Sequence, residues 1–192
     1  VGFWKGNSSK QEMKFNAVVG NPPYQMMDGG AQASATPVYN LFVDTARALK
    51  ANYISMIMPA RWYSGGKGLD EFRISMLEDQ HISRLDDFLN PETVFPNTNI
   101  RGGLCFFLWD SSYNSNEQKT RVVSHDSTGV VSDTMRTLKT NNIDTFIRSY
   151  EAISIINKVF QTMPETFESH ISSLRPFGLR GYFSKNENCK ET

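Results

Sequence analysis

Short apolar runs alternate with amphipathic stretches along the first half of the chain. The runs at 15–20, 53–58 and 82–89 are apolar and partly β-branched, which predicts buried strands. The stretches at 38–50 and 69–78 repeat apolar residues at helical spacing, which predicts helices. Strands that alternate with helices favour a mostly parallel sheet with right-handed crossovers.

The pattern changes after the third predicted strand. Two further apolar runs, 100–109 and 120–125, are joined by a polar stretch with no helix, which predicts an antiparallel hairpin. Polar sequence from 127 onward precedes a predicted helix at 150–161, with Ser149 as its N-cap. We therefore divide the chain into three parts: a leader at 1–13, a core at 14–126, and a C-terminal piece at 127–192.

The composition narrows the class of protein. The 192 residues, 39% of them hydrophobic, suffice for a domain with a real core. No apolar run approaches the ~20 residues of a membrane-spanning helix, so we expect no membrane association. Two cysteines and no basic-then-apolar leader favour the reducing cytoplasm. The 20 basic and 20 acidic residues cancel, so any DNA contact needs help beyond net charge.

The sharpest chemical signal is Asn21-Pro22-Pro23-Tyr24, directly after the first predicted strand. The Asn21 side-chain oxygen and the Pro22 carbonyl could accept both hydrogens of an amine conjugated to a ring. The amine lone pair would then point toward an electrophile, without a charged general base. Tyr24 offers a flat face for stacking on an extruded base. The alternative is a stiff loop with a surface tyrosine.

The run 15–24 (FNAVVGNPPY) resembles the catalytic motif of N6-adenine DNA methyltransferases. Blocks that follow in order resemble methylases of restriction-modification systems in which methylase and endonuclease share a chain: 53–62 (YISMIMPARW), 64–73 (SGGKGLDEFR) and 101–110 (RGGLCFFLWD). The segment 175–183 (RPFGLRGYF) resembles the start of their DNA-reading region.

This resemblance implies an α/β fold, the later half of a Rossmann-like methyltransferase sheet that is mostly parallel with an antiparallel hairpin, plus a C-terminal extension. It implies S-adenosylmethionine as cofactor and double-stranded DNA as partner, with adenine N6 methylated after base flipping. The implied roles are target binding by Asn21 and Pro22, stacking by Tyr24, cofactor contact by Pro23, and a place beside the target pocket for Arg61 and Trp62. Lys67, in a glycine-rich loop, is a candidate for contact with a DNA phosphate.

Nothing before Asn21 matches the glycine-rich motif with which the family binds its cofactor. We therefore expect the chain to be the C-terminal half of a catalytic domain, inactive by itself. Its partners would be the upstream half of the domain, with endonuclease and specificity regions, in the bacterial cytoplasm.

Two other functions stay open from the sequence. Release-factor methyltransferases use the same Asn-Pro-Pro-Tyr motif on a protein glutamine amide. The second alternative is a truncated domain without catalysis, which only binds DNA or assembles with other subunits. The three histidines, His81, His125 and His170, are isolated and predict no metal site.

Overall fold

The computed structural model describes residues 15–26, 35–98, 100–163 and 170. The chain divides into two compact units, residues 1–153 and 154–192. The predicted leader and the predicted DNA-reading segment at 175–183 lie outside the described residues.

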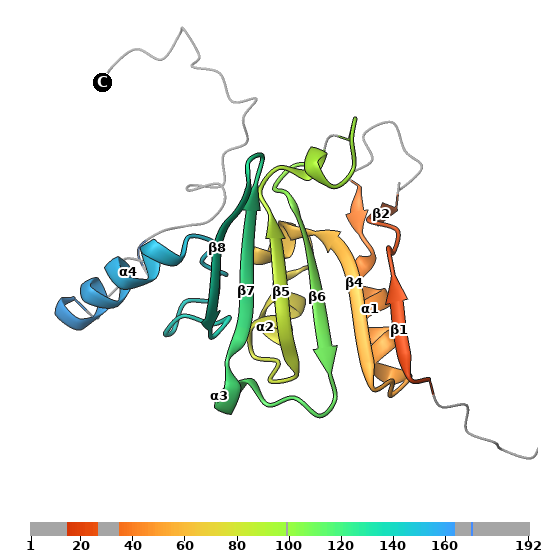
Figure 1. Ribbon diagram of the computed structural model, residues 1–192, viewed down its shortest axis with the longest axis horizontal. Helices are drawn as coiled ribbons and strands as arrows, with labels where there is room; N and C mark the ends of the chain where they lie inside the picture. The colour runs from red at the N-terminus through yellow and green to blue at the C-terminus, as the bar shows by residue number, and fades with distance from the viewer. Residues whose placement is uncertain (1–14, 27–34, 99, 164–169, 171–192) are drawn as a thin grey trace, which may run out of the picture. The chain divides into compact units, whose positions relative to one another are not determined.

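The first unit is built on a six-stranded sheet with the strand order β1-β4-β6-β5-β7-β8 (Figure 1). The strands are β1 (Ala17–Gly20), β4 (Tyr53–Pro59), β5 (Ile82–Phe88), β6 (Leu104–Asp110), β7 (Thr120–Asp126) and β8 (Gly129–Arg136). β1 pairs with β4, and β5 with β7, in parallel; β6 is antiparallel to both β4 and β5, and β8 is antiparallel to β7. Hence β1, β4, β5 and β7 run in one direction, which confirms the predicted α/β class.

The predicted hairpin between 100–109 and 120–125 is wrong. β6 lies between β4 and β5, where Cys105 is in register with Met58 on one side and Asp87 on the other. β7 lies on the far side of β5, and its hairpin partner is β8. Six of the seven residues of β6 are apolar, so a central position buries them better than an edge does. The connection at 111–119, which includes the short helix α3 (Ser115–Gln118), passes the end of the intervening strand.

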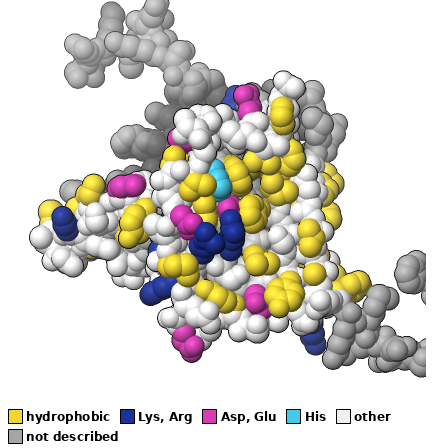
Figure 2. Space-filling view, in the orientation of Figure 1, with side chains coloured by type: hydrophobic (Ala, Val, Ile, Leu, Met, Phe, Trp, Pro, Cys, Tyr) yellow, Lys and Arg dark blue, Asp and Glu magenta, His cyan; other side chains and the backbone are white. Residues whose placement is uncertain are grey.

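Two helices cover one face of the sheet, α1 (Tyr39–Ala48) and α2 (Asp70–Leu77) (Figure 1). Both confirm the helices predicted from apolar spacing, and their buried side chains join those of the central strands in one core. The opposite face of the sheet carries hydrophobic side chains around a cluster of charged ones (Figure 2). On β5, Asp86 is almost fully buried and contacts both Arg84 and His125.

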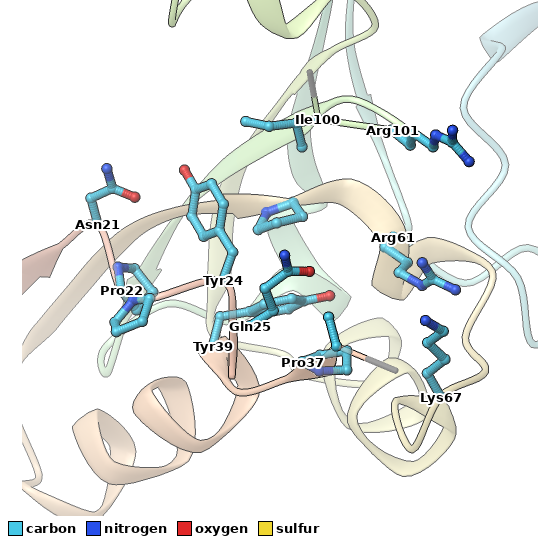
Figure 3. A pocket seen from close by; sticks show the side chains of 13 residues that line it. Asn21, Pro22, Tyr24, Gln25, Pro37, Tyr39, Arg61, Lys67, Ile100 and Arg101 are labelled. Carbon is cyan, nitrogen blue, oxygen red and sulfur yellow. The ribbon is translucent and has the colours of Figure 1, made fainter. Parts of the chain in front are cut away.

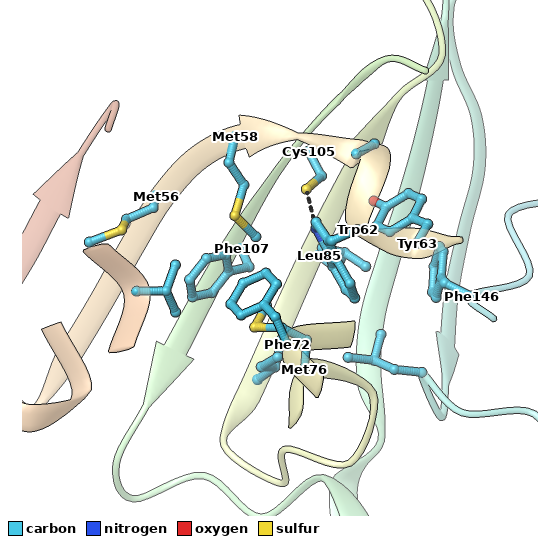
Figure 4. Packing of buried hydrophobic residues seen from close by; sticks show 14 of the residues in the cluster. Met56, Met58, Trp62, Tyr63, Phe72, Met76, Leu85, Cys105, Phe107 and Phe146 are labelled. Atoms are coloured by element: carbon cyan, nitrogen blue, oxygen red, sulfur yellow. Dashed lines mark hydrogen bonds between the residues drawn. The ribbon is translucent and has the colours of Figure 1, made fainter. Parts of the chain in front are cut away.

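Several buried aromatic residues pack together where β4 continues into the 3₁₀ helix η1 (Ala60–Tyr63) (Figure 4). Trp62 is fully buried, and its indole Nε1–H donates to Cys105 Sγ at 3.3 Å. Its ring meets those of Tyr63 and Phe72 edge to face, with centroids 4.7 and 6.0 Å apart. Such aromatic pairs stabilise a fold beyond the area that they bury.

The compact unit continues past residue 126, the predicted end of the core. β8 completes the sheet, and Phe146 is buried against the core with its ring centroid 4.5 Å from that of Tyr63. The backbone N–H of Phe146 donates to the Tyr63 carbonyl at 3.0 Å. The spacing of apolar residues does not indicate this continuation, because the stretch contributes few buried apolar residues, chiefly Leu138 and Phe146.

The last helix, α4 (Tyr150–Thr162), confirms the helix predicted at 150–161. The Ser149 hydroxyl accepts a hydrogen bond from the Ala152 N–H at 3.4 Å, which agrees with the predicted N-cap. α4 begins in the first unit and continues into the second. Among the described residues, no helix combines the length and apolarity that crossing a bilayer requires.

Burial makes Cys105 a test of the packed core. Desolvation raises the pKa of its thiol to about 12, although the Trp62 hydrogen bond acts in the opposite direction. The reactive thiolate forms only as the pH approaches that value. In a Cys189→Ser chain, we therefore expect iodoacetamide to leave Cys105 unlabelled at pH 8 and to label it in urea. Rapid labelling without denaturant would contradict the burial.

Candidate functional site

A cavity of about 790 Å³ opens at the edge of the sheet where β1 and β4 end and β6 begins. Asn21 follows β1, Pro59 ends β4, and Ile100 and Arg101 precede β6. Because β6 is antiparallel, its amino end lies at the same edge as the carboxyl ends of β1 and β4. Ligands of open α/β sheets bind at this edge.

The Asn21–Tyr24 segment forms one end of the cavity (Figure 3). Pro22 is buried, whereas Asn21 and Pro23 are exposed. The fixed φ of the two prolines stiffens the backbone as it leaves the sheet. The Tyr24 carbonyl accepts a hydrogen bond from the Val38 N–H at 3.3 Å, next to the short antiparallel pair β2 (Gln25–Met26) and β3 (Thr36–Pro37). The segment is thereby tied to the start of α1.

Two tyrosine hydroxyls at the cavity, those of Tyr24 and Tyr39, are buried and donate no hydrogen bond to any of the described residues. Burial raises the pKa of Tyr24. It also raises the pKa of Tyr39, against the opposing charge of nearby Arg61. Both hydroxyls therefore stay protonated at neutral pH and can donate a hydrogen bond. A buried polar atom without a hydrogen-bond partner destabilises the fold. A ligand that accepts a hydrogen bond from these hydroxyls would remove that destabilisation.

Three cations form the other end of the cavity: Arg61 on η1, Lys67 in the glycine-rich loop, and Arg101 before β6 (Figure 3). In the part of the chain that the structure describes, their side chains make no hydrogen bond or ion pair. No Asp or Glu is found among the described residues that line the cavity. Neutral acceptors and a tyrosine ring thus face a concentrated positive charge.

Arg73 on α2 holds the glycine-rich loop that presents Lys67. Its Nη1 donates to the Ser64 carbonyl and to Asp70 Oδ1, each at 2.8 Å. Gly65 adopts φ +72°, and a Cβ there would lie 1.7 Å from the same Nη1. Only glycine combines this backbone with this close approach. The loop therefore has a defined structure and does not resemble a phosphate-binding loop in its spacing.

The structure brings most of the predicted site residues to one cavity. Those that line it are Asn21, Pro22, Pro23, Tyr24, Arg61 and Lys67. Trp62 does not line the cavity, because its side chain is fully buried in the core. The predicted contact of Trp62 with the substrate is therefore wrong. η1 turns neighbouring residues in opposite directions, so Arg61 faces the cavity while Trp62 faces the core.

Tyr39 and Arg101 are among the cavity residues that the sequence analysis did not assign to the site. Tyr39 looked like an ordinary apolar position at the start of a helix, and Arg101 lay inside a run assigned to a strand. The strand begins only at Leu104, because Gly102 and Gly103 adopt φ +93° and +88°. The sequence Arg-Gly-Gly before an apolar run was the available signal for a turn at this edge.

Residues 2–95 match the family described as Eco57I restriction-modification methylase. The resemblance expected from the sequence is confirmed. The matched segment contains β1, the Asn21–Tyr24 motif, Arg61 and Lys67, and it ends before Arg101.

A curated relative from Mycoplasma pneumoniae (strain ATCC 29342 / M129), described as an uncharacterized adenine-specific methylase, is 27% identical over 160 residues. The match covers 82% of this chain and 37% of the relative, so the chain spans little more than a third of that protein. A methyltransferase subunit of a type I restriction-modification system from Streptococcus thermophilus gives a TM-score of 0.42 at 14% identity. That alignment covers 81% of this chain and 33% of the subunit. A structure of a type I restriction-modification system gives a TM-score of 0.41, also at 14% identity, over 83% of this chain and 33% of the other.

Proposed function

We propose that the protein containing this chain transfers a methyl group from S-adenosylmethionine to N6 of adenine in double-stranded DNA, within a restriction-modification system. The observation that carries the proposal is the layout of one cavity. Its neutral end holds the Asn21–Tyr24 motif, and its other end holds three cations that pair with no described residue. The match to restriction-modification methylases supports the same reaction.

The neutral end suits an exocyclic amine. The N6 lone pair of adenine is delocalised into the ring, which makes it a poor nucleophile. Acceptance of its two hydrogens by Asn21 Oδ1 and the Pro22 carbonyl would localise that lone pair and aim it. Because Pro22 is buried and its φ is fixed, its carbonyl need not reorganise during the reaction.

Tyr24 supplies a stacking face for the base. Its ring is half-buried beside Asn21 at the neutral end (Figure 3). A base can reach Asn21 only if it leaves the duplex, because N6 is paired inside the double helix. Stacking on an aromatic ring offsets part of the cost of extrusion, at roughly 1–3 kcal/mol per base. The volume of about 790 Å³ is ordinary for a small-ligand site and admits a nucleotide.

The cationic end favours DNA over a protein substrate. A glutamine side chain is neutral and offers Arg61, Lys67 and Arg101 a carbonyl oxygen at most, with no negative charge to pair with. A flipped nucleotide carries its phosphates on the side away from the reacting amine, which is where these cations lie. The net charge of the chain is zero, so a local concentration of cations is what attracts the DNA backbone.

The cavity also fits the cofactor in part. S-adenosylmethionine supplies an electrophilic methyl group on a positively charged sulfur. That charge is best accommodated at the neutral end, away from Arg61 and Arg101, and Pro23 is the predicted contact there. Further cofactor contacts would come from the upstream half of the catalytic domain. We place the complete protein in the bacterial cytoplasm, with endonuclease and specificity regions as its other parts.

The decisive experiment uses the full-length protein, unmethylated duplex DNA and S-adenosylmethionine labelled in its methyl group. We expect label in DNA, recovered as N6-methyladenine after digestion. Label on a protein glutamine would instead assign the release-factor type of reaction. No transfer to either substrate would leave a domain that binds or assembles without catalysis. The isolated 192-residue chain is a useful control, since we expect it to be inactive.

The three cations make a prediction about salt. Each phosphate contact releases condensed counterions, so DNA affinity falls with salt in proportion to their number. We expect Lys67→Ala to weaken DNA binding about equally for all sequences and to lower the salt slope by about 1. Fluorescence anisotropy over a salt series measures both. Lys119→Ala is the matched control, because Lys119 lies outside the cavity; an unchanged slope for Lys67→Ala would exclude a phosphate contact.

A further inference from the structure

The turn that carries Arg101 is fastened by a residue from far along the chain. Arg148 donates from Nε and Nη2 to the two carboxylate oxygens of Asp87, at 2.8 and 2.7 Å. Its Nη1 donates to the Gly102 carbonyl at 2.8 Å. One guanidinium thus joins the end of β5 to the turn before β6. Asp87 is fully buried, while the Arg148 side chain is 28% exposed.

The turn is held tightly on its other sides as well. A Cβ on Gly103 would lie 2.3 Å from the Phe88 carbonyl oxygen and 2.9 Å from Arg148 Nη2. The Gly103 carbonyl accepts a hydrogen bond from the Ala60 N–H at 3.0 Å, at the start of η1. The turn therefore contacts both β5 and η1, and Arg148 adds a hydrogen bond to it. Residues 100 and 101 project from this fixed base into the cavity.

A second cavity lies beside the first. It has a volume of about 390 Å³ and includes Arg61, Arg101 and Arg148 in its lining. Arg61 and Arg101 line both cavities and form the wall between them. Arg148 therefore lies next to the cationic end of the site. The charge of Arg148 is paired with Asp87, whereas Arg61 and Arg101 form no ion pair with the described residues and can bind a ligand.

We propose that Arg148 is a positioning residue for the site: its ion pair with Asp87 and its bond to Gly102 hold the turn at 100–103, so that Arg101 meets a DNA phosphate at the wall between the two cavities. The proposal rests on the proposed function, because it takes DNA as the ligand. It assigns Arg148 a role through Arg101 and no contact with the reacting atoms.

The chemistry requires arginine at this position. A planar guanidinium reaches both Asp87 oxygens and a carbonyl at once, with all three bonds in one fork. Lysine at 148 would keep the charge beside Asp87 but could not make the three bonds with this geometry. We therefore expect Arg148→Lys to retain the ion pair and to release the turn in part. Arg148→Ala leaves a fully buried carboxylate without its cation.

The test compares Arg148→Lys, Arg148→Ala and Arg101→Ala in the full-length protein. We expect Arg148→Ala and Arg101→Ala each to raise the KM for DNA about 10-fold, with kcat and S-adenosylmethionine affinity unchanged. Arg148→Lys should give a smaller increase. Arg84→Ala is the matched control, since Arg84 also pairs with a buried aspartate, Asp86, but lines neither cavity.

A double-mutant cycle separates positioning from general stability. If Arg148 acts through Arg101, Arg148→Ala has no further effect on the DNA KM once Arg101 is alanine. A full additional 10-fold rise in that background would overturn the proposal. So would an unchanged KM in Arg148→Ala alone, or a parallel loss of kcat and cofactor affinity.

Hydrogen exchange gives a readout that does not depend on activity. We expect Arg148→Lys to speed exchange of the amides at 100–103 while leaving those of β4 and β5 unchanged. Equal exchange in the variant and the wild type would overturn the positioning role, whatever the kinetics show. If the wild-type protein methylates no DNA, the proposed function fails, whereas the exchange experiment still decides whether Arg148 holds the turn.

Discussion

Replacing Asn21 by alanine is expected to reduce methyl transfer to DNA by about 100- to 1,000-fold, as does removal of one preorganised polar group in other active sites. Asn21 Oδ1 is one of two acceptors at the neutral end of the cavity. Without it, one N6 hydrogen has no acceptor and the lone pair of the amine is no longer aimed. Single-turnover transfer of labelled methyl groups to DNA by the full-length protein measures the loss.

The control for this substitution is the DNA affinity. Asn21 is exposed and makes no contribution to the core, so Asn21→Ala should fold normally and bind DNA through the unchanged cationic end. A variant that loses rate and affinity equally would contradict a role confined to the reacting amine. Asn21→Asp keeps an oxygen at the same place and should retain more activity than alanine, because both N6 hydrogens again find acceptors.

Local periodicity predicted the elements of the first half of the chain well. β1, β4 and β5 and the helices α1 and α2 fall within or close to their predicted ranges. The predicted burial of β1 is wrong, because it is an edge strand and its Val19 is 79% exposed. Each element was predicted from the spacing of its own apolar residues, although three apolar residues of the α1 stretch, Leu41, Phe42 and Leu49, are exposed. The partner of a strand depends on the rest of the sheet, which spacing does not encode. The apolar run of β6 correctly indicated a strand but did not reveal that β4 and β5 would flank it.

The candidate site, like the fold, could be predicted where its features are local in sequence and not where they depend on distant contacts. The motif Asn21–Tyr24 could be found from sequence because its chemistry is contained in four consecutive residues. Arg148 could not, because its function comes from contacts with Asp87 and Gly102 at a sequence separation of 61 and 46 residues. Tyr39 and Arg101 also gain their meaning only when the sheet edge is assembled. The sequence thus predicted the residues at the neutral end of the cavity and only part of those at its cationic end.

Trp62 gives the largest expected effect on stability. Its side chain is fully buried, its Nε1–H donates to Cys105, and its ring packs against Tyr63 and Phe72. Trp62→Ala removes these contacts and leaves a cavity in the core, so we expect the free energy of unfolding to fall by about 3–5 kcal/mol. Urea titration followed by circular dichroism measures the change. Trp62→Phe should lose less, because a smaller ring still fills part of the space.

The neighbouring residue provides the matched control. Arg61 is exposed and lines the cavity, so Arg61→Ala should change the free energy of unfolding by about 0.5 kcal/mol or less while weakening DNA binding. Trp62→Phe should have the opposite profile, with lower stability and nearly unchanged DNA affinity under native conditions. A Trp62→Phe protein that keeps its stability but loses DNA binding would return Trp62 to the target pocket. The two substitutions together therefore decide which face of η1 belongs to the site and which to the core.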